Sequence, residues 1–574
     1  MKKFLLKLEV SRKQDYIFSS KKLRDNAARS AEIDFVTGHR TREGRDFFRE
    51  AAGNLYDCAE NLVYSGGGHA VLQFDDEKQA TEFAKRVTKA AMERFHSMEL
   101  FVKRLRFDEN ILGDERPTAF QRKIGAANLR ELSRRLEEKK ALRRNAVGQV
   151  SFGVEKMNRR TFQPESTESA QAENMEESVE VPDGCKYPSK IEHLCGEDNF
   201  MAVVHIDGNG MGMRVHKTIY DKDSETDWDG LRKELKDFSE TVDAAFKSAF
   251  RRTAEQVAAY LERNPETLNH TPKSNQSQDP PPVRALPIRP VILAGDDVCF
   301  VTMGGIGLEC ARLFLENLRN PESGEAYYAC AGVALTHRKY PFHKAYALSE
   351  ELCSNAKKFV AEIRKAEAEQ GAAVHGVSAI DWHIEFGQLR GDLDEIRRAY
   401  DTEDRIQTAD GSQKPRRMEL RPVVLLAGDE KDASKRVDID SGVCGEMTGG
   451  VRTYDYFKAL CQAMRGEYGQ TARGKIKDLR TAFKQGAVES RYFLRSKEVS
   501  YLLYQAFHAK YRTEEEQRNK FKEVLDNWKE SGETASFRGE AFKDVRGVSR
   551  CLFFDAVEMI DHFTALGIRE EAET

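Results

Sequence analysis

Apolar runs that end abruptly in acidic residues and glycine occur at two places in the chain. Residues 200–206 lead into Asp207 and a glycine-rich loop, and residues 291–293 lead into Ala294-Gly295-Asp296-Asp297, after which apolar residues resume at once. Such runs are typical of buried strands, and glycine permits tight backbone turns. The pattern therefore predicts a strand that ends at Asp207 and a hairpin with the three residues 295–297 at its tip.

The same order of elements occurs twice. We expect strand, helix, hairpin and helix at about 4–10, 20–58, 62–74 and 80–95, and again at 200–206, 228–263, 291–302 and 307–319, followed by a strand at 328–335. This order indicates an internal duplication. The tip of the first hairpin is Gly66-Gly67-Gly68-His69, so only the second copy has acids to bind a metal. A single histidine on a glycine turn is interpreted as a polar surface contact.

The predicted fold class is α+β, with several domains. We expect a first domain at 1–150, a polar connector at 151–195, a second domain at 196–390, a linker region at 391–445 and a C-terminal helical domain at 446–574. Residues 264–290 hold seven prolines and interrupt the second domain. They are interpreted as a surface insertion, because loop-closure entropy grows slowly with length.

Composition argues against a general polyanion-binding surface and against a membrane anchor. The 91 basic residues are balanced by 95 acidic residues, so any contact with nucleic acid has to be local. No apolar stretch approaches the length of a membrane span, and we expect a soluble, cytoplasmic protein. The ten cysteines form no Cys-x-x-Cys pair and indicate reduced thiols. Cys185 and Cys195 would supply only half of a zinc site.

Three carboxylates at neighbouring strand ends predict a particular chemistry. Asp207, Asp296 and Asp297 would repel one another strongly if they were brought together. Hard divalent cations such as Mg²⁺ or Mn²⁺ relieve that repulsion, and two such ions about 3.5–4 Å apart serve phosphoryl transfer. The alternative is that the Asp-Asp pair is a solvated turn. The apolar flanks on both sides favour the metal interpretation.

In this order the motifs resemble the large subunit of type III CRISPR effector complexes, the family of tandem-palm cyclic oligoadenylate synthases. The resemblance covers about residues 1–390. It is carried by residues 15–24 (DYIFSSKKLR), the Gly66-Gly67-Gly68 turn, the Asp207 loop, the hairpin at 294–297, residues 330–341 (CAGVALTHRKYP), residues 356–358 (AKK) and residues 378–383 (SAIDWH).

The resemblance implies two tandem palm domains, ferredoxin-like and of the nucleotide-cyclase type, that bind ATP and join it into cyclic oligoadenylate. It implies catalytic and metal-binding roles for Asp207, Asp296 and Asp297. Guide or target RNA and other effector-complex subunits are the implied partners. Lys357 is the candidate for a triphosphate contact, with Lys358 as the alternative. The implied nucleotide-binding residues are Gly67, Gly68, Gly208, Asn209, Gly210, Gly212, Gly295 and Lys357.

Two features depart from the family pattern. Ala294 replaces the first glycine of the usual Gly-Gly-Asp-Asp sequence, and the four-cysteine zinc site is reduced to Cys185 and Cys195. The chain has no His-Asp dipeptide and the first strand begins at Phe4, so we expect the N-terminal nuclease domain to be absent. DNA cleavage is not expected.

Three other functions stay open at this stage. The chain can be a non-catalytic palm scaffold of an RNA-guided complex, although the intact acid triad argues against that. It can be a cyclic dinucleotide synthase, although the single-palm members of that class work as homodimers, whereas two palms share this chain. A template-directed polymerase would need a basic channel, and the near-neutral net charge gives no sign of one.

Overall fold

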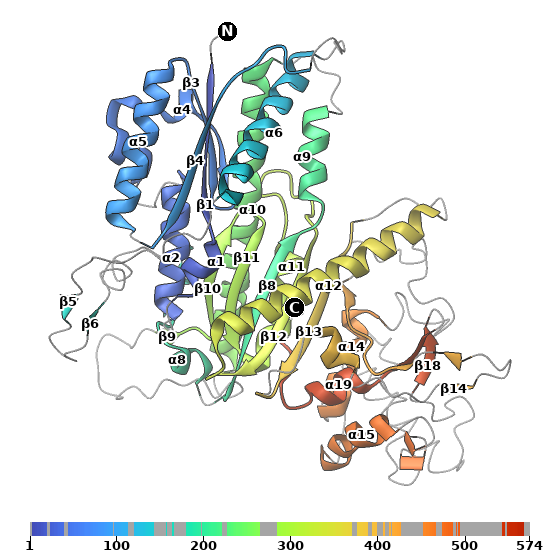
Figure 1. The fold of residues 1–574 in the computed structure, drawn as a ribbon. Helices are drawn as coiled ribbons and strands as arrows, with labels where there is room; N and C mark the ends of the chain where they lie inside the picture. Colours follow the sequence, from blue (N-terminus) through green and yellow to red (C-terminus); the bar gives the residue numbers. More distant parts are fainter. Residues whose placement is uncertain are drawn as a thin grey trace, which may run out of the picture.

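The computed structural model describes a mixed α/β protein with several sheets (Figure 1). The described residues are 3–19, 23–38, 44–95, 97–112, 120–142, 156–157, 164–165, 179–196, 198–220, 227–264, 284–369, 376–387, 393–398, 406–407, 413–414, 416–425, 452–465, 473–485, 489–490, 492–493, 542–545 and 548–566.

The first unit is built on a four-stranded antiparallel sheet with the order β2-β3-β1-β4. Its strands are β1 (Phe4–Ser11), β2 (Leu62–Gly66), β3 (His69–Phe74) and β4 (Glu99–Arg106). Its helices are α1 (Lys13–Ile17), α2 (Leu23–Val36), α3 (Phe47–Ala52), α4 (Cys58–Asn61), α5 (Glu77–Arg94) and α6 (Phe120–Ala141), with a 3-10 turn at Gly53–Leu55.

Alternating side chains of β1 supply apolar surface to both faces of this sheet. Leu6 packs in a cluster with Phe83 of α5, and Leu5 packs in another cluster with Leu132 of α6. Successive residues of a strand point to opposite faces, so the two helices cover opposite sides of the sheet.

The second unit is built on a six-stranded sheet with the order β10-β11-β8-β12-β13-β17. Only β12 and β13 are parallel; the other neighbours are antiparallel. The strands are β8 (Phe200–Gly208), β10 (Ile288–Ala294), β11 (Asp297–Met303), β12 (Ala329–His337), β13 (Ser378–Glu385) and β17 (Val423–Leu425). The helices are α8 (Ile191–Cys195), α9 (Met211–Tyr220), α10 (Trp228–Arg263), α11 (Gly307–Asn317), α12 (Phe342–Glu369) and α13 (Leu393–Arg398), with a 3-10 turn at Gly304–Ile306.

Helices α10 and α11 cover one face of the second sheet, where Phe246 and Phe314 pack with Phe300 of β11. Helix α12 covers the other face. It lies unusually close to β12 because Gly332 has no side chain. A Cβ atom at Gly332 would lie 2.0 Å from the backbone oxygen of Ser349 and 2.3 Å from the backbone nitrogen of Cys353.

The two units share apolar surface. One cluster contains Leu6 and Val10 of the first unit together with Met201, Val203 and Val291 of the second. Helix α10 joins the units as well, because Leu231 packs with Leu5 of the first unit whereas Phe250 packs with Phe300 of the second. In Figure 1, α10 runs between the upper and lower sheets.

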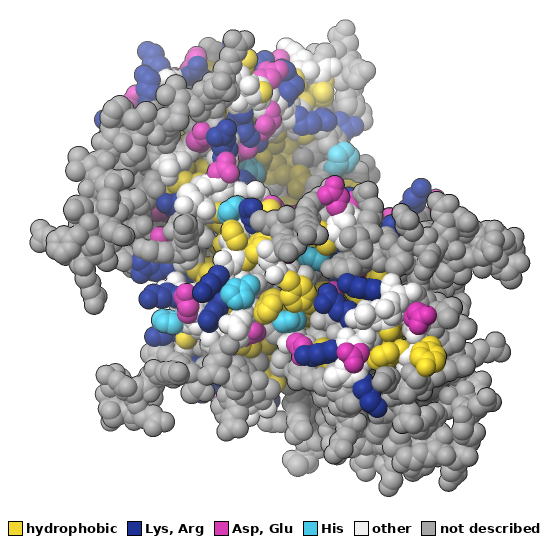
Figure 2. All heavy atoms as spheres, turned by 60° about the horizontal axis from the view of Figure 1, so that its bottom comes forward, with side chains coloured by type: hydrophobic (Ala, Val, Ile, Leu, Met, Phe, Trp, Pro, Cys, Tyr) yellow, Lys and Arg dark blue, Asp and Glu magenta, His cyan; other side chains and the backbone are white. Residues whose placement is uncertain are grey.

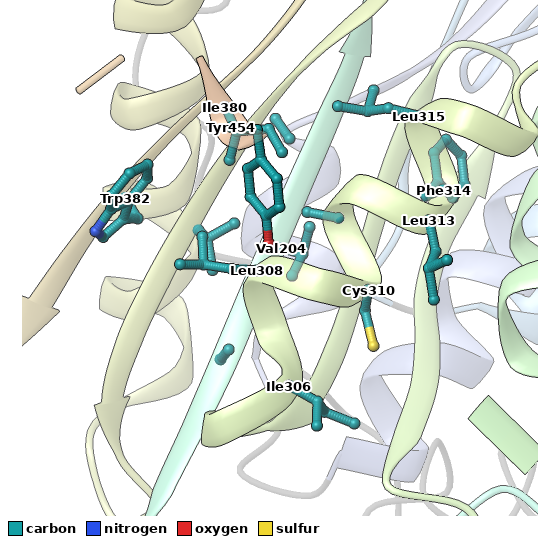
Figure 3. Packing of buried hydrophobic residues seen from close by; sticks show 14 of the residues in the cluster. Val204, Ile306, Leu308, Cys310, Leu313, Phe314, Leu315, Ile380, Trp382 and Tyr454 are labelled. Atoms are coloured by element: carbon teal, nitrogen blue, oxygen red, sulfur yellow. The ribbon is translucent and has the colours of Figure 1, made fainter. Parts of the chain in front are cut away.

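The C-terminal part of the chain packs on the second unit. Its described elements are β16 (Arg416–Arg417), α14 (Tyr454–Arg465), α15 (Arg473–Gln485), β18 (Phe542–Val545), β19 (Val548–Cys551) and α19 (Phe554–Met559). Figure 3 shows Tyr454 among Val204, Leu308 and Ile380, and its hydroxyl donates a hydrogen bond to Glu309 at 2.7 Å. The segment from residue 446 is therefore not purely helical as predicted, because β18 and β19 pair with each other and with β16.

Secondary structure also occurs inside three segments that the sequence assigns to a connector, a linker and an insertion. The end of the connector at 151–195 is ordered into β7 (Cys185–Lys186) and α8, with Leu194 and Cys195 buried. The linker at 391–445 contains the sixth strand, β17. The end of the insertion at 264–290 contains β9 (Arg284–Ala285) and the start of β10, whereas residues 265–283 lie outside the described part.

The small remaining strands are β5 (Lys156–Met157), β6 (Pro164–Glu165), β14 (Ile406–Gln407) and β15 (Gln413–Lys414). Among the described residues, no helix is long and apolar enough to cross a membrane. On the face shown in Figure 2, basic and acidic side chains of the described residues are interspersed, in agreement with the balanced charge of the sequence.

Candidate functional site

The predicted acidic residues lie at adjacent strand ends. Asp297, the first residue of β11, pairs in register with Asp207, near the end of β8. Asp296 lies in the turn between β10 and β11, and the strand pair closes at Ala294 and Asp297. Gly295 has φ +66, a left-handed conformation that favours glycine. The hairpin therefore has the predicted form, except that Asp297 already belongs to the strand.

The electrostatic environment disfavours charge on two of the three acids. Burial and the nearby Asp207 carboxylate raise the pKa of Asp296 to about 6. Burial also raises the pKa of Asp297, against the attraction of His205 and Lys13. One oxygen of Asp297, Oδ1, is buried without a hydrogen-bond partner among the described residues, although 45% of the side chain is exposed. These acids are short of positive charge.

Asp207 is paired with a lysine. Nζ of Lys357, on α12, lies 2.5 Å from Oδ2 of Asp207 and donates to the backbone oxygen of Gly208 at 3.1 Å. The alternative candidate, Lys358, is exposed on the same helix. A lysine that neutralises the first acid is well placed near a phosphate site, but its contact with a triphosphate stays a prediction.

Glycines at the end of β8 and in the loop that follows allow two strand ends to approach closely. The backbone nitrogen of Gly208 donates to the oxygen of Asp296 at 3.2 Å, and a Cβ atom at Gly208 would lie 3.0 Å from Cβ of Asp296. Gly210 has φ +70, and Gly212 lies in the first turn of α9 with open space around its Cα. The close approach at Gly208 and the positive φ at Gly210 therefore both favour glycine.

Asn209, a predicted nucleotide-binding residue, is used to hold this loop in place. Its backbone nitrogen donates to the oxygen of Tyr328 at 2.8 Å, and its side-chain Nδ2 donates to the oxygen of Val377 at 2.8 Å. The side chain is buried. Its evident role is therefore to tie the loop to the neighbouring strands.

A cavity of about 650 Å³ lies between the tips of the two hairpins. That volume is in the range of small-molecule sites. Of the predicted residues, Gly67, Gly212, Gly295 and Asp296 line it, whereas Asp207, Asp297, Lys357, Asn209, Gly208, Gly210 and Gly68 are outside its lining. Its other walls include Tyr64, His69, Arg130, Ser133, Val215, His216, Phe238 and Val242.

His69 lies in the wall of this cavity, which differs from the surface contact predicted for it. Burial lowers its pKa to about 4, with a further contribution from Lys7, so the imidazole is neutral at pH 7. The ring meets Tyr64 edge-on at 5.6 Å between centroids. On the same turn, Gly67 and Gly68 have φ +57 and +77, and Nζ of Lys13 donates to the oxygen of Gly67 at 2.5 Å.

The side chains of this site meet only some of the requirements for binding a divalent cation. The oxygen donors, the shortage of positive charge and the unpartnered Oδ1 of Asp297 suit Mg²⁺ or Mn²⁺. However, within the described part of the chain no group of three or more His, Cys, Asp or Glu side chains could hold a metal ion. Cys185 and Cys195 also belong to no such group among the described residues, and burial raises the pKa of both thiols.

Several residues near the acids were not singled out in the sequence. His205 faces Asp297, with Nδ1 and Oδ1 3.7 Å apart, and its ring meets Tyr346 of α12 edge-on at 5.5 Å. Because His205 and Asp207 are two residues apart on one strand, the period of two places them on the same face. This alternation along the strand is the feature of the sequence that could have identified His205 as a neighbour of the acids.

No protein-family model matches the chain, and no curated protein matches it. Solved structures of Csm1 do match. The chain resembles Csm1. Csm1 is the type III CRISPR large subunit, which is the kind of protein that the sequence motifs resemble.

The similarity to Csm1 is distant. The apo Csm1-Csm4 cassette is 15% identical with a TM-score of 0.38, and the cassette in complex with cA3 is 15% identical with a TM-score of 0.39. Csm1 of T. onnurineus is also 15% identical, with a TM-score of 0.38. Each match covers 62% of this chain but only 52–53% of the Csm1 chain, so about half of the matched protein's length is spanned.

Proposed function

We propose that this protein is a metal-dependent nucleotidyltransferase that joins ATP into cyclic oligoadenylate, acting in the cytoplasm as a subunit of a CRISPR-type antiviral complex. The observation that carries the proposal is the pairing of Asp207 with Asp297 beside Asp296, at the edge of a cavity that both hairpin tips line. In this proposal the two units are tandem palms and the first has lost its acids.

The residues divide the expected work between them. Asp207, Asp296 and Asp297 would hold Mg²⁺ or Mn²⁺, which would activate the attacking hydroxyl and stabilise the leaving pyrophosphate. The glycine turns leave room for phosphate oxygens next to the backbone. Lys357 would place a compact positive charge beside them. The apolar walls formed by Val215 and Phe238 suit the flat face of a base.

The deciding experiment is to incubate the purified protein with each nucleoside triphosphate and Mg²⁺ or Mn²⁺, with and without guide and target RNA, and to identify the products by mass. We expect cyclic oligoadenylate from ATP. The Asp296→Asn/Asp297→Asn double variant should form none while its circular dichroism stays that of the wild type. Equal product from the double variant would refute the metal assignment.

A non-catalytic scaffold is the second candidate, and two observations favour it. Lys357 neutralises Asp207 at 2.5 Å, and the three carboxylates do not form a metal-holding group among the described side chains. The same assay separates the candidates, because a scaffold gives no product under any condition. A cyclic dinucleotide would be recognised by its mass.

A further inference from the structure

The tips of the two hairpins contact the same helix, one turn apart. Oγ of Ser239, on α10, donates to the backbone oxygen of Ser65 in the first hairpin at 2.6 Å. The backbone nitrogen of Gly295, in the second hairpin, donates to Oδ1 of Asp243 at 3.3 Å. Residues four apart in an α-helix lie on one face about 6 Å apart along the axis. A single turn of α10 therefore spaces the two tips.

Both contacts are local and specific. A Cβ atom at Gly66 would lie 3.1 Å from Oγ of Ser239, so the first turn rests directly on this hydroxyl. Asp243 is fixed in its turn by Nζ of Lys247 at 2.8 Å. Its side chain is only 18% exposed, which limits competition from water for the amide of Gly295.

Helix α10 is anchored in both units, so it cannot slide freely along its axis. Towards its first residues, Nε1 of Trp228 donates to Oε1 of Gln73 at 2.6 Å, and Arg232 donates to the oxygen of Glu60 at 2.6 Å. Beyond Asp243, Phe246 and Phe250 are buried in the core of the second unit. Ser239 and Asp243 lie between these two anchors.

The contacts bear directly on the cavity. Ser239 and Val242 of α10 line it together with Gly66, Gly67, Gly295 and Asp296. Any change in the spacing of the tips alters the width of this cavity and the position of Asp296 relative to the first turn. Neither Ser239 nor Asp243 belongs to the acid triad.

We propose that Ser239 and Asp243 are positioning residues that together set the separation of the two hairpin tips, and with it the width of the ligand cavity. The spacing itself is independent of the reaction. Its effect on nucleotide handling rests on the function proposed above.

Hydrogen exchange of the full-length protein tests the spacing without any assumption about activity. We expect Asp243→Ala to speed exchange at the amide of Gly295 by about tenfold, because that amide loses its acceptor. Ser239→Ala should speed exchange in residues 65–68 and leave Gly295 unchanged. Glu240→Ala is the matched control, since Glu240 is 66% exposed on the same helix. Unchanged exchange at both tips would overturn the proposal.

Nucleotide handling provides the second readout. We expect the Ser239→Ala/Asp243→Ala protein to show an ATP KM raised by at least about fivefold with a smaller change in kcat, because a looser cavity weakens positioning. Ser239→Thr, which keeps the hydroxyl, should recover most of the loss in the single variant. Altered exchange with unchanged KM would refute the link to the cavity. If the wild type turned over no nucleotide, the proposed function would fail, and the exchange result would still decide the spacing.

Discussion

At the scale of single residues, the fold makes ionisation of the Asp296 and Asp297 carboxyl groups unfavourable. Burial and proximity to Asp207 raise the pKa of Asp296 to about 6 from an ordinary value of 3.8. A carboxyl whose pKa is higher in the folded protein destabilises the fold when it is ionised. The penalty is absent below about pH 3.8 and complete above about pH 6.

We therefore expect Asp296→Asn to raise the Tm of the metal-free protein by a few degrees at pH 7.5, with the gain disappearing as the pH falls towards 4. Melting in the presence of a chelator at both pH values measures this. Asp478→Asn, at an exposed position of α15, serves as the control and should change little. If the wild type were more stable than Asp296→Asn at pH 7.5, the pKa of Asp296 would not be raised in the folded protein.

Lys357 is the lysine that contacts the acidic site. Because its ammonium group contacts both Asp207 and the carbonyl of Gly208, Lys357→Ala should lower ATP turnover by about 10–100-fold, the usual effect of losing a group that orients a ligand. Lys358→Ala should stay within about twofold. The measurement is the initial rate at saturating ATP. Equal losses in the two variants would remove the case for Lys357.

At the scale of elements, the close packing of α12 on β12 depends on Gly332. Gly332→Ala would place a methyl group within 2.0–2.3 Å of the backbone of α12. Overpacking of this kind costs about 1–3 kcal/mol or more. We expect a clear loss in the free energy of unfolding, measured with denaturant, and weaker turnover because α12 also carries Lys357.

The control for this change is Gly474→Ala in α15, where a Cβ atom meets nothing within 4 Å. Alanine is the better helix former by about 1 kcal/mol, so this variant should be neutral or slightly more stable. A Gly332→Ala protein as stable as the wild type would mean that α12 lies further from the sheet than described.

Elements with a strong local pattern could be predicted from the sequence. The helix expected at 228–263 is α10, Trp228–Arg263, and the acidic hairpin is β10 and β11, because apolar periodicity and glycine turns are local signals. Strand β17 was missed because three apolar residues in a polar region are too short a signal. The roles of Ser239, Asp243 and Asn209 depend on tertiary contacts between residues that are distant in sequence. A local sequence pattern does not reveal such contacts.

At the scale of the whole molecule, buried charges tie the C-terminal part to the second sheet. Arg421 is completely buried and donates to Oε2 of Glu558 at 3.0 and 3.1 Å. It also lies 3.1 Å from Asp555. Burial alone would raise the pKa of Glu558, but Arg421 and Arg480 lower it. The arginine thus offsets the burial of Glu558, whereas burial still raises the pKa of Asp555.

Arg421→Ala should destabilise the protein by about 3–5 kcal/mol, because it leaves carboxylates buried without their partner. Thermal melting and limited proteolysis of the C-terminal part would measure this. Arg417→Ala removes an exposed arginine four residues earlier and should change the Tm by less than about one degree. Similar melting of both variants would show that the network contributes nothing.

The apolar cluster shared by the two units gives the first unit a structural role that does not depend on catalysis. Removal of this unit would expose apolar side chains of β10, such as Val291, because α2 of the first unit packs on that strand. An exposed apolar face of that kind promotes aggregation. We therefore expect the second unit to aggregate when it is produced without the first, because the first unit covers part of its apolar surface.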